Sequence, residues 1–516
     1  MNKSLKKTLP TIISGILLGL SYPSFPEIPT GILAWFAFVP VLLATREETN
    51  FKTYLWQTFS VFLISGPINF WWTALFSWKA FVVCYTTQTW GVYLPFLLHF
   101  FLQKRFDWQR ALFLLPFHWT ILDALTHLLP HTLQVNNIAY TQANNIWLIQ
   151  FTDITGMWGI TFWIVMMNVL ITFLSVQKEI EIKKIALISA WLLVVLGYSF
   201  LNMKLSPKNA IGTDNLTTKV SIIQTNSDSY SHDSTKTQKV FDKIIALSDS
   251  AVRTAQPDLI VLPEAAIPIP LFQNKELLDF TKKAIATWQT SVAIGFEEYE
   301  DKSFKNNALV FTPQLAMFWD SLKIKPNDVK VYQKEYGLPF IETMPYCADC
   351  QTLTDQKMLK GNEPYIFQYN NTEGEISKVA LTICWEQMYP HKIAELVDEG
   401  AEFIALMNND AWFGTSPGAK QLLSFTRMRA IENRRSIVRC SNGGISCFID
   451  PFGRITNQLP WFTSTIGTQE VLKVSRKSFY TKHPYFFVEL VSVLFLLLFL
   501  KYELSKKYLK KEASQS

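Results

Sequence analysis

Charged residues are scarce in this chain: only 17% of its 516 residues are Asp, Glu, Lys or Arg, whereas 49% are apolar. With 39 Phe and 17 Trp, the composition is too apolar for an ordinary soluble protein and indicates a membrane protein with a soluble part. The formal net charge is only +6, so nothing points to a nucleic-acid partner. The length exceeds one compact core, and we expect two or more domains.

Cysteine is also scarce, with six residues. Cys347 and Cys350 form a lone C-x-x-C motif, and no second pair or nearby His residues accompany it, which argues against a zinc site. In an oxidising compartment these two residues would favour a local disulfide, but the sequence leaves open whether they are bridged. We predict no metal site and no cofactor.

Long apolar runs dominate the first part of the chain. Seven of them, and an eighth near the C-terminus, approach the ~20 residues needed to cross the hydrocarbon layer of a membrane. They lie near 8–25, 30–45, 55–77, 80–103, 110–129, 150–176, 185–203 and 483–501. The first run is alternatively a signal peptide, but no small-residue cleavage pattern follows it and the next span begins almost at once. The sequence thus predicts a multi-pass α-helical membrane domain at 1–204 and a transmembrane helix with a basic cytoplasmic tail at 483–516.

The basic residues of the short loops predict the orientation of these spans. If the N-terminus is cytoplasmic, the inside segments carry sixteen Lys and Arg residues, whereas the outside short loops carry only Lys79. The loop 130–147 has neither Lys nor Arg. Seven spans would therefore deliver the large segment 205–482 to the outer face of the membrane.

That segment has a different pattern, in which short β-branched apolar runs alternate with amphipathic stretches. Predicted strands lie at 219–226, 258–264, 291–299, 307–313, 378–386, 401–410, 436–442 and 446–453, and predicted helices at 234–255, 274–289, 390–399 and 418–434. The strands are continuously apolar rather than alternating, which indicates sheets covered on both faces. We expect an α/β sandwich with its reactive residues at strand ends.

Three reactive side chains follow such strands. Glu264 ends the run LIVLPE, Lys334 lies in VYQKEYG, and Cys384 ends ALTIC. Taken alone, each has a simpler interpretation: a solvated strand end, a surface charge, and a small core residue. A thiol nucleophile, however, needs a base and a positive group for the oxyanion, and three strand ends that meet would supply both. The combination predicts that Cys384 is a catalytic nucleophile.

The order LPE…K…CWE resembles the carbon–nitrogen hydrolase (nitrilase) superfamily, which places a Glu-Lys-Cys triad on an α-β-β-α sandwich. Four downstream motifs narrow the resemblance: NNDAWFG (408–414), RMRAIENRR (427–435), SNGGIS (441–446) and DPFGRI (450–455). Together with seven spans before and one after, the chain is similar to the apolipoprotein N-acyltransferase family. The resemblance implies a nitrilase-like domain at 205–482.

The resemblance also implies a role for each matched residue. Glu264 would be the general base, Lys334 the cation that stabilises the oxyanion, and Cys384 the thiol that accepts the acyl group. Glu342, in PFIETMP, would match a further carboxylate that positions Lys334 or the incoming amine.

Trp385 and Glu386 match the aromatic–acid pair after the nucleophile, and the backbone N–H of Trp385 would contribute to the oxyanion hole. The implied reaction moves a fatty acyl chain from a membrane phospholipid, through a Cys thioester, to the N-terminal amine of the diacylglyceryl-Cys of an apolipoprotein. The implied location is the bacterial inner membrane, with the catalytic domain on its periplasmic face.

Two alternatives remain: a membrane-anchored nitrilase-type amidohydrolase, and a non-enzymatic membrane protein with a degenerate nitrilase domain. Eight spans exceed what an anchor requires, and the whole triad is present.

Asp123 and His118 lie within the fifth predicted span, where ionisable groups invite a functional interpretation. Asp123 can equally pair with a neighbouring helix, so we leave both residues out of the site. For Arg427, Arg429 and Arg439 we favour salt bridges inside the sandwich over contacts with lipid phosphate.

Overall fold

The computed structural model of the chain describes residues 3–24, 30–129, 134–177, 182–204, 216–227, 234–267, 270–344, 352, 357–361 and 364–515. It divides into two compact units. One unit comprises Met1–Asn202 and His483–Ser516, and the other comprises Met203–Lys482. Cys347 and Cys350, the predicted disulfide candidates, lie outside the described residues.

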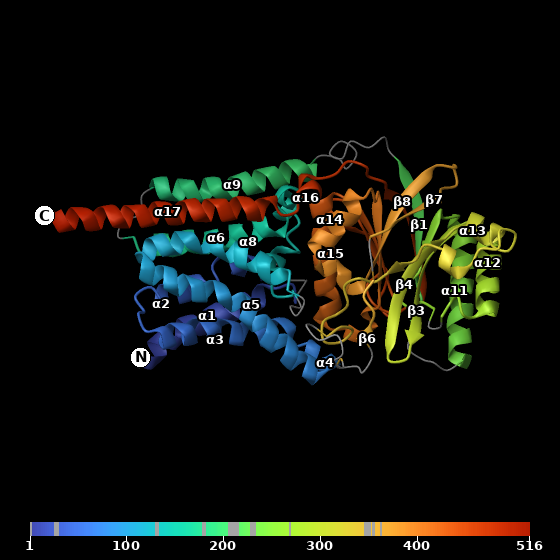
Figure 1. Ribbon diagram of the computed structural model, residues 1–516, viewed down its shortest axis with the longest axis horizontal. Helices are drawn as coiled ribbons and strands as arrows, with labels where there is room; N and C mark the ends of the chain where they lie inside the picture. Colours follow the sequence, from blue (N-terminus) through green and yellow to red (C-terminus); the bar gives the residue numbers. More distant parts are fainter. Residues whose placement is uncertain are drawn as a thin grey trace. The chain divides into compact units, whose positions relative to one another are not determined.

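The first unit is helical. Its longer helices are α1 (Lys3–Ser21), α3 (Phe51–Phe70), α5 (Trp78–Arg105), α6 (Trp108–His127), α8 (Met157–Ser175), α9 (Ile182–Lys204) and α17 (Phe486–Gln515), and short ones are η1 (Thr30–Trp35), α2 (Val39–Ala44), α4 (Thr73–Phe76) and α7 (Thr152–Thr155). Each predicted span contains helix, although the second holds only η1 and the six residues of α2. Figure 1 shows α6, α8 and α17 running alongside one another.

Among the described helices, α8 alone is both long and apolar enough to cross a membrane. Shorter apolar helices occupy Thr8–Ser21, Thr30–Ala44 and Leu192–Lys204. The multi-pass arrangement therefore remains a prediction, while the helical character of the region is established.

Asp123 and His118 have protein partners inside the helical unit. The Asp123 carboxylate accepts hydrogen bonds from Asn137 Nδ2 at 2.8 Å and from Thr161 Oγ1 at 3.1 Å. The His118 ring faces two backbone carbonyls, those of Leu114 at 2.8 Å and Pro95 at 3.1 Å. These contacts tie α6 to its neighbours and give both ionisable groups hydrogen-bond partners within the protein.

The second unit contains two sheets. The first has the strand order β13-β1-β2-β3-β4-β5, with β6 paired to β4, and the second has the order β12-β11-β10-β9-β8-β7. The strands are β1 (Thr217–Gln224), β2 (Leu259–Val261), β3 (Ser291–Glu300), β4 (Ser303–Phe311), β5 (Tyr332–Gln333), β6 (Lys357–Met358), β7 (Ile366–Asn370), β8 (Ile376–Ile383), β9 (Phe403–Asn408), β10 (Ser436–Ser441), β11 (Cys447–Ile449), β12 (Ile455–Thr456) and β13 (Thr465–Leu472). In each sheet three central strands are parallel: β1, β2 and β3, and β8, β9 and β10.

Helices cover the outer faces of both sheets (Figure 1): α11 (Ser234–Ala255), α12 (Lys275–Trp288) and the short α13 (Pro313–Phe318) on one side, and α14 (Pro390–Asp398) and α15 (Pro417–Asn433) on the other. One apolar cluster joins the inner faces, for example Val261 with Leu381. A second packs Ala380 and Ile404 against α14 and α15. Alternate residues of β8 thus enter different layers, and the predicted α-β-β-α sandwich is confirmed.

Candidate active site

Cys384 lies at a sharp turn directly after β8. The strand ends at Ile383, and a 3₁₀ helix, η5, begins at Cys384 and ends at Met388. Cys384 has a φ of +50°, the left-handed region that costs a non-glycine residue about 1 kcal/mol or more. Gln387 Nε2 donates to the Cys384 carbonyl at 2.9 Å and closes the turn. The half-buried thiol is thereby fixed at the carboxyl end of a parallel strand, as predicted.

Glu264 follows β2 by three residues and lies on the facing sheet. Its Oε1 accepts hydrogen bonds from Asn306 Nδ2 at 2.8 Å and from Lys334 Nζ at 3.0 Å. The segment that contains Glu264 packs tightly on β3. A Cβ atom at Gly295 would lie only 2.6 Å from the Pro263 carbonyl oxygen. Only glycine fits there, and this close approach buries the carboxylate at the sheet end.

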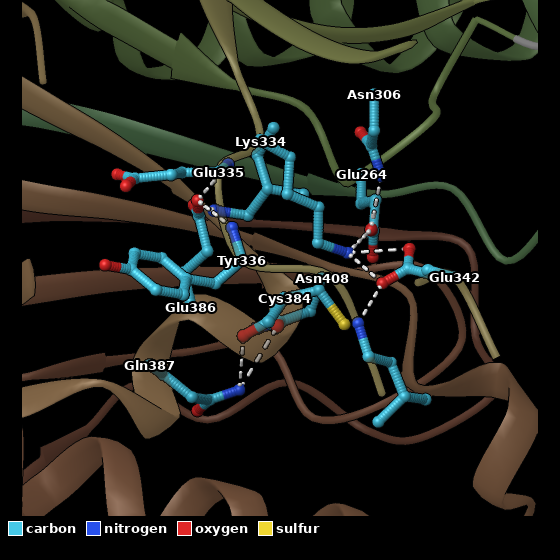
Figure 2. Close-up of polar contacts among 12 residues, drawn as sticks. Glu264, Asn306, Lys334, Glu335, Tyr336, Glu342, Cys384, Glu386, Gln387 and Asn408 are labelled. Atoms are coloured by element: carbon cyan, nitrogen blue, oxygen red, sulfur yellow. Dashed lines mark hydrogen bonds and ion pairs between the residues drawn. The ribbon is translucent and has the colours of Figure 1, made fainter. Parts of the chain in front are cut away.

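Lys334 follows β5 immediately and is fully buried. Its backbone N–H donates to the Asn306 carbonyl at 2.8 Å, which continues the pairing with β4. Its Nζ contacts Glu264 and also Glu342, whose Oε1 and Oε2 lie 2.8 and 3.0 Å away (Figure 2). Burial alone lowers the pKa of Lys334, but the charges of Glu264 and Glu342 outweigh it and hold that pKa well above its ordinary value. The ammonium group therefore stays charged.

Glu342 completes a cluster of two carboxylates around one lysine, which we call the ionic cluster (Glu264, Lys334 and Glu342). The backbone N–H of Leu338 donates to Glu342 Oε2 at 2.6 Å and holds this carboxylate in its loop. Figure 2 shows the sulfur of Cys384 below the ionic cluster in this view, and the charges of Glu264, Lys334 and Glu342 all act on the thiol. The structure thus brings together the three predicted catalytic side chains and the predicted supporting carboxylate.

The electrostatics of this site favour a neutral thiol at rest. Burial, followed by the charge of Glu264, raises the pKa of the Cys384 thiol well above its ordinary value, although Lys334 opposes this. Burial also raises the pKa of Glu264, with Lys334 again opposing and Glu342 adding to the rise. A carboxylate with a raised pKa accepts a proton from a thiol more readily than an ordinary one does. The raised pKa of Glu264 therefore suits a general base.

Glu386 has a different environment from Glu264. It is fully buried, and its oxygens accept from Tyr332 Oη at 2.5 Å, the Glu335 N–H at 2.7 Å and the Ile383 N–H at 2.8 Å. These donors lie on both sides of Lys334 and just before Cys384. Glu386 therefore joins the segment that contains Lys334 to the turn Cys384–Met388, which we call the nucleophile turn after the predicted role of Cys384. Trp385, the other predicted supporting residue, is buried within the turn.

Sequence reasoning missed two polar residues of the site. Asn306, on β4, holds Glu264, and Gln387 closes the nucleophile turn; its Oε1 in turn accepts from Thr426 Oγ1. The only signal for Asn306 was its position beside Asn307 at the start of an apolar strand. Nothing in the local pattern distinguished Gln387 from an ordinary helix residue.

The remaining predicted groups are structural. Arg439 Nη1 contacts Asp410 Oδ2 at 2.7 Å and Arg429 Nε contacts Glu432 at 3.1 Å, all four side chains being fully buried. The predicted salt bridges inside the sandwich are therefore confirmed for Arg429 and Arg439, whereas Arg427 Nε donates to the Gly453 carbonyl at 2.8 Å. Over the described ranges, no group of three or more His, Cys, Asp or Glu side chains has the arrangement of a metal site.

Comparison with known proteins agrees with this geometry. Residues 219–476 match the carbon–nitrogen hydrolase family, and residues 14–170 match the apolipoprotein N-acyltransferase N-terminal domain. Apolipoprotein N-acyltransferase of Chlorobaculum tepidum is 29% identical over 491 residues, covering 92% of each chain. That of Geobacter metallireducens is 26% identical over 505 residues, covering 92% of this chain and 91% of the relative.

Among solved structures, Saccharomyces cerevisiae Nit3, a nitrilase-superfamily member, matches with a TM-score of 0.37 and 16% identity, over 50% of this chain and 90% of its own. The family match spans nearly all of the sandwich, including Glu264, Lys334, Glu342 and Cys384, and the N-terminal match spans most of the helical region. The chain therefore belongs to the carbon–nitrogen hydrolase family, in the group that carries the apolipoprotein N-acyltransferase N-terminal domain.

Proposed function

We propose that this protein transfers a fatty acyl chain from a membrane phospholipid to the N-terminal amine of the diacylglyceryl-Cys of apolipoproteins, through a thioester on Cys384. Its relatives over most of the chain are named apolipoprotein N-acyltransferases. The observation that carries the chemistry is the buried ionic cluster beside a half-buried thiol on a strained turn. It combines a base, a fixed cation and a nucleophile in one place.

In the first step, the Cys384 sulfur attacks the ester carbonyl carbon of the phospholipid while Glu264 takes the thiol proton. Lys334 Nζ and the backbone N–H of Trp385 stabilise the negative oxygen of the tetrahedral intermediate. The carbon–oxygen bond to the glycerol then breaks. Glu264 gives the thiol proton to the leaving oxygen, so the lysophospholipid departs as an alcohol, Glu264 is again a free base, and the acyl chain remains on the sulfur.

In the second step, the α-amine of the apolipoprotein attacks the thioester carbonyl. Glu264 takes a proton from the amine and returns it to the departing Cys384 thiolate, so an amide forms and the free thiol is restored. Glu342 holds Lys334 through both steps, since its two oxygens contact Nζ. Water competes with the amine at the thioester, so a closed, apolar surround favours transfer over hydrolysis.

Both substrates carry lipid tails that stay in the bilayer, which requires the site to work at a membrane surface. We infer that the helical unit is a multi-pass domain of the bacterial inner membrane, with α8 as its clearest span. The excess of Lys and Arg in alternate loops supports a periplasmic location for the catalytic unit.

The test uses purified full-length protein and a phospholipid of defined acyl chain, followed by mass spectrometry of the Cys384 peptide. We expect an acyl adduct on Cys384 that disappears when a diacylglyceryl lipopeptide with a free amine is added, with the amide as product. Cys384→Ala should abolish the adduct, whereas Cys447→Ala, which removes a buried thiol of β11, should retain it.

Rapid turnover of small amides without lipid, and no adduct from phospholipid, would instead identify an amidohydrolase. Neither activity, in a folded wild-type protein, would identify a non-enzymatic domain. Each outcome excludes the acyl-transfer proposal.

A further inference from the structure

A third buried carboxylate, Glu297, borders the ionic cluster. It lies on β3, and the antiparallel register with β4 places it directly opposite Asn306. Directly opposed residues project to the same face of a sheet with their Cβ atoms about 5 Å apart. Asn306 is the residue whose Nδ2 donates to Glu264. Glu297 is thus one side chain removed from the proposed general base, and the proposed mechanism does not use it.

The hydrogen bonds around this pair leave one buried oxygen unexplained. Tyr299 Oη donates to Glu297 Oε2. Asn306 Nδ2 is committed to Glu264, but within the described part of the chain no donor reaches Asn306 Oδ1, although this oxygen is buried. A buried amide oxygen without a donor costs about 1–3 kcal/mol. The opposed Glu297 can supply the missing donor only when it carries a proton.

The charges around Glu297 favour that proton. The groups that face it are Tyr299 from its own strand, Glu264 from the end of β2, and Lys334 and Glu342 from beyond β5. Burial raises the pKa of Glu297 to about 7, and Glu264 and Glu342 add to this rise, while the hydrogen bond from Tyr299 and the charge of Lys334 oppose it. At neutral pH and below, a large fraction of Glu297 is therefore the neutral acid.

We propose that Glu297 is a positioning residue of the acyl-transfer site: as a neutral acid it donates to Asn306 Oδ1 and keeps the amide N–H of Asn306 directed at Glu264. This inference rests on the proposed function of the site. When Glu297 loses its proton, it becomes an acceptor and competes for the same Asn306 amide group. Rotation of the amide then withdraws a hydrogen bond from Glu264 and presents an oxygen to it, so the base is no longer held for the thiol.

The test compares four full-length proteins: wild type, E297Q, E297A and E298Q. In E297Q the side-chain amide imitates the neutral acid, since its N–H can donate to Asn306 and its oxygen can accept from Tyr299. E298Q is the matched control, because Glu298 is the next residue, projects to the other face of β3, and accepts from Asn307 Nδ2 at 2.9 Å. Thermal unfolding of each variant confirms that it is folded.

Two rates are measured from pH 5.5 to 8.5: alkylation of Cys384 by iodoacetamide and thioester formation from phospholipid, both by mass spectrometry of the Cys384 peptide. We expect the ratio of the wild-type rate to the E297Q rate to be near one at pH 6. This ratio should fall about three- to tenfold by pH 8.5, because the wild type then loses one hydrogen bond that E297Q keeps. E297A should be slower than wild type by about tenfold at pH 6. E298Q should follow wild type at every pH.

Two results would overturn the positioning role. One is a ratio of the wild-type rate to the E297Q rate that does not change with pH, and the other is a rate for E297Q as low as that of E297A at pH 6. The alkylation rate requires no lipid, so it reports on the base even when acyl transfer is absent. Failure of the proposed function would appear as the absence of any thioester in wild type, with the alkylation profiles still able to support or refute the role of Glu297.

Discussion

Two regions of the catalytic unit meet at the active site and are held by different forces. The ionic cluster comes from segments that follow β2 and β5, and its single ammonium group lies within 3.0 Å of two carboxylates. The nucleophile turn, Cys384–Met388, follows β8 on the other sheet and is held by neutral donors on Glu386 and by Gln387. The first region sets the charge at the site, and the second sets the position of the sulfur.

The contrast between Glu264 and Glu386 explains why we propose different roles for two buried carboxylates of one site. Glu386 accepts from three groups within 2.8 Å, all of them neutral backbone or hydroxyl donors. Burial raises the pKa of Glu386, and these hydrogen bonds oppose that rise. Glu264 has one amide donor and one ammonium group on the same oxygen, Oε1. A carboxylate whose donors gather on one oxygen can exchange a proton with a thiol through the other, whereas a saturated carboxylate serves as a structural link.

Breaking the ionic cluster should have the largest effect. Lys334→Met removes the cation between Glu264 and Glu342 and leaves one buried and one partly buried carboxylate without its counter-charge. We expect the rate of thioester formation to fall about 10³-fold and the free energy of unfolding to fall by about 3–5 kcal/mol. Single-turnover acylation and chemical denaturation in detergent measure the two effects.

The control is Lys282→Met, which removes another buried lysine, on α12, that contacts Asp279 and Asp320 at 2.9 Å. It should lower stability while leaving the acylation rate of the folded fraction unchanged. Equal losses of rate in both variants would mean that Lys334 acts only through stability.

The sequence predicted the strands that are apolar on both faces and missed those that are not. β1, β3, β8, β9 and β10 belong to the parallel centres of the sheets, where both faces are buried. β13 was missed because it lies at an edge, pairs only with β1 in the first sheet, and has a mixed burial pattern. β5 has two residues, too few for any periodic pattern.

The dependence on a local sequence pattern also explains which site residues were found. Glu264 and Cys384 each stand near the end of a strand that local pattern reveals, whereas Lys334 follows β5, which is too short for such a pattern. Family resemblance linked the three residues. Asn306 and Glu297 act through their register across β3 and β4, and a one-residue shift of that register would turn either side chain to the other face. Register depends on the turn and on packing against the rest of the sheet, so it could not be obtained from local sequence.

Weakening the nucleophile turn should have an intermediate effect. In Glu386→Gln one oxygen becomes an N–H group, which then faces the Ile383 N–H or the donors from Tyr332 and Glu335. We expect the free energy of unfolding to fall by about 2 kcal/mol and the acylation rate to fall about 10- to 100-fold through misplacement of Cys384.

The pH profile of the remaining rate separates the two regions, because the charges of the ionic cluster are intact in this variant. It should keep the wild-type shape, measured by single-turnover acylation between pH 5.5 and 8.5. Glu395→Gln, at a half-exposed position of α14, is the control and should be close to wild type in both rate and stability. A shifted profile in Glu386→Gln would show that Glu386 sets charge as well as position, contrary to the comparison.

The smallest effect on the reaction is expected at His391, which lies behind the nucleophile turn on α14 and contacts Tyr336 Oη through Nε2 at 3.2 Å. Burial, with the charges of Lys392 and Arg429, lowers the pKa of His391 to about 4, although Glu335 opposes this. Between this value and the ordinary pKa near 6.5, the unfolded chain binds the proton and the folded chain does not, so stability falls as the pH falls. From pH 7 to pH 5 the loss of unfolding free energy due to this residue should be about 2 kcal/mol.

His391→Gln should remove that part of the loss and leave acylation at pH 7 unchanged, as urea unfolding at the two pH values and a single-turnover assay will show. If wild type and His391→Gln lose equal stability over this range, the ring is protonated in the folded protein, and the region behind the turn is held by charge in the same way as the ionic cluster.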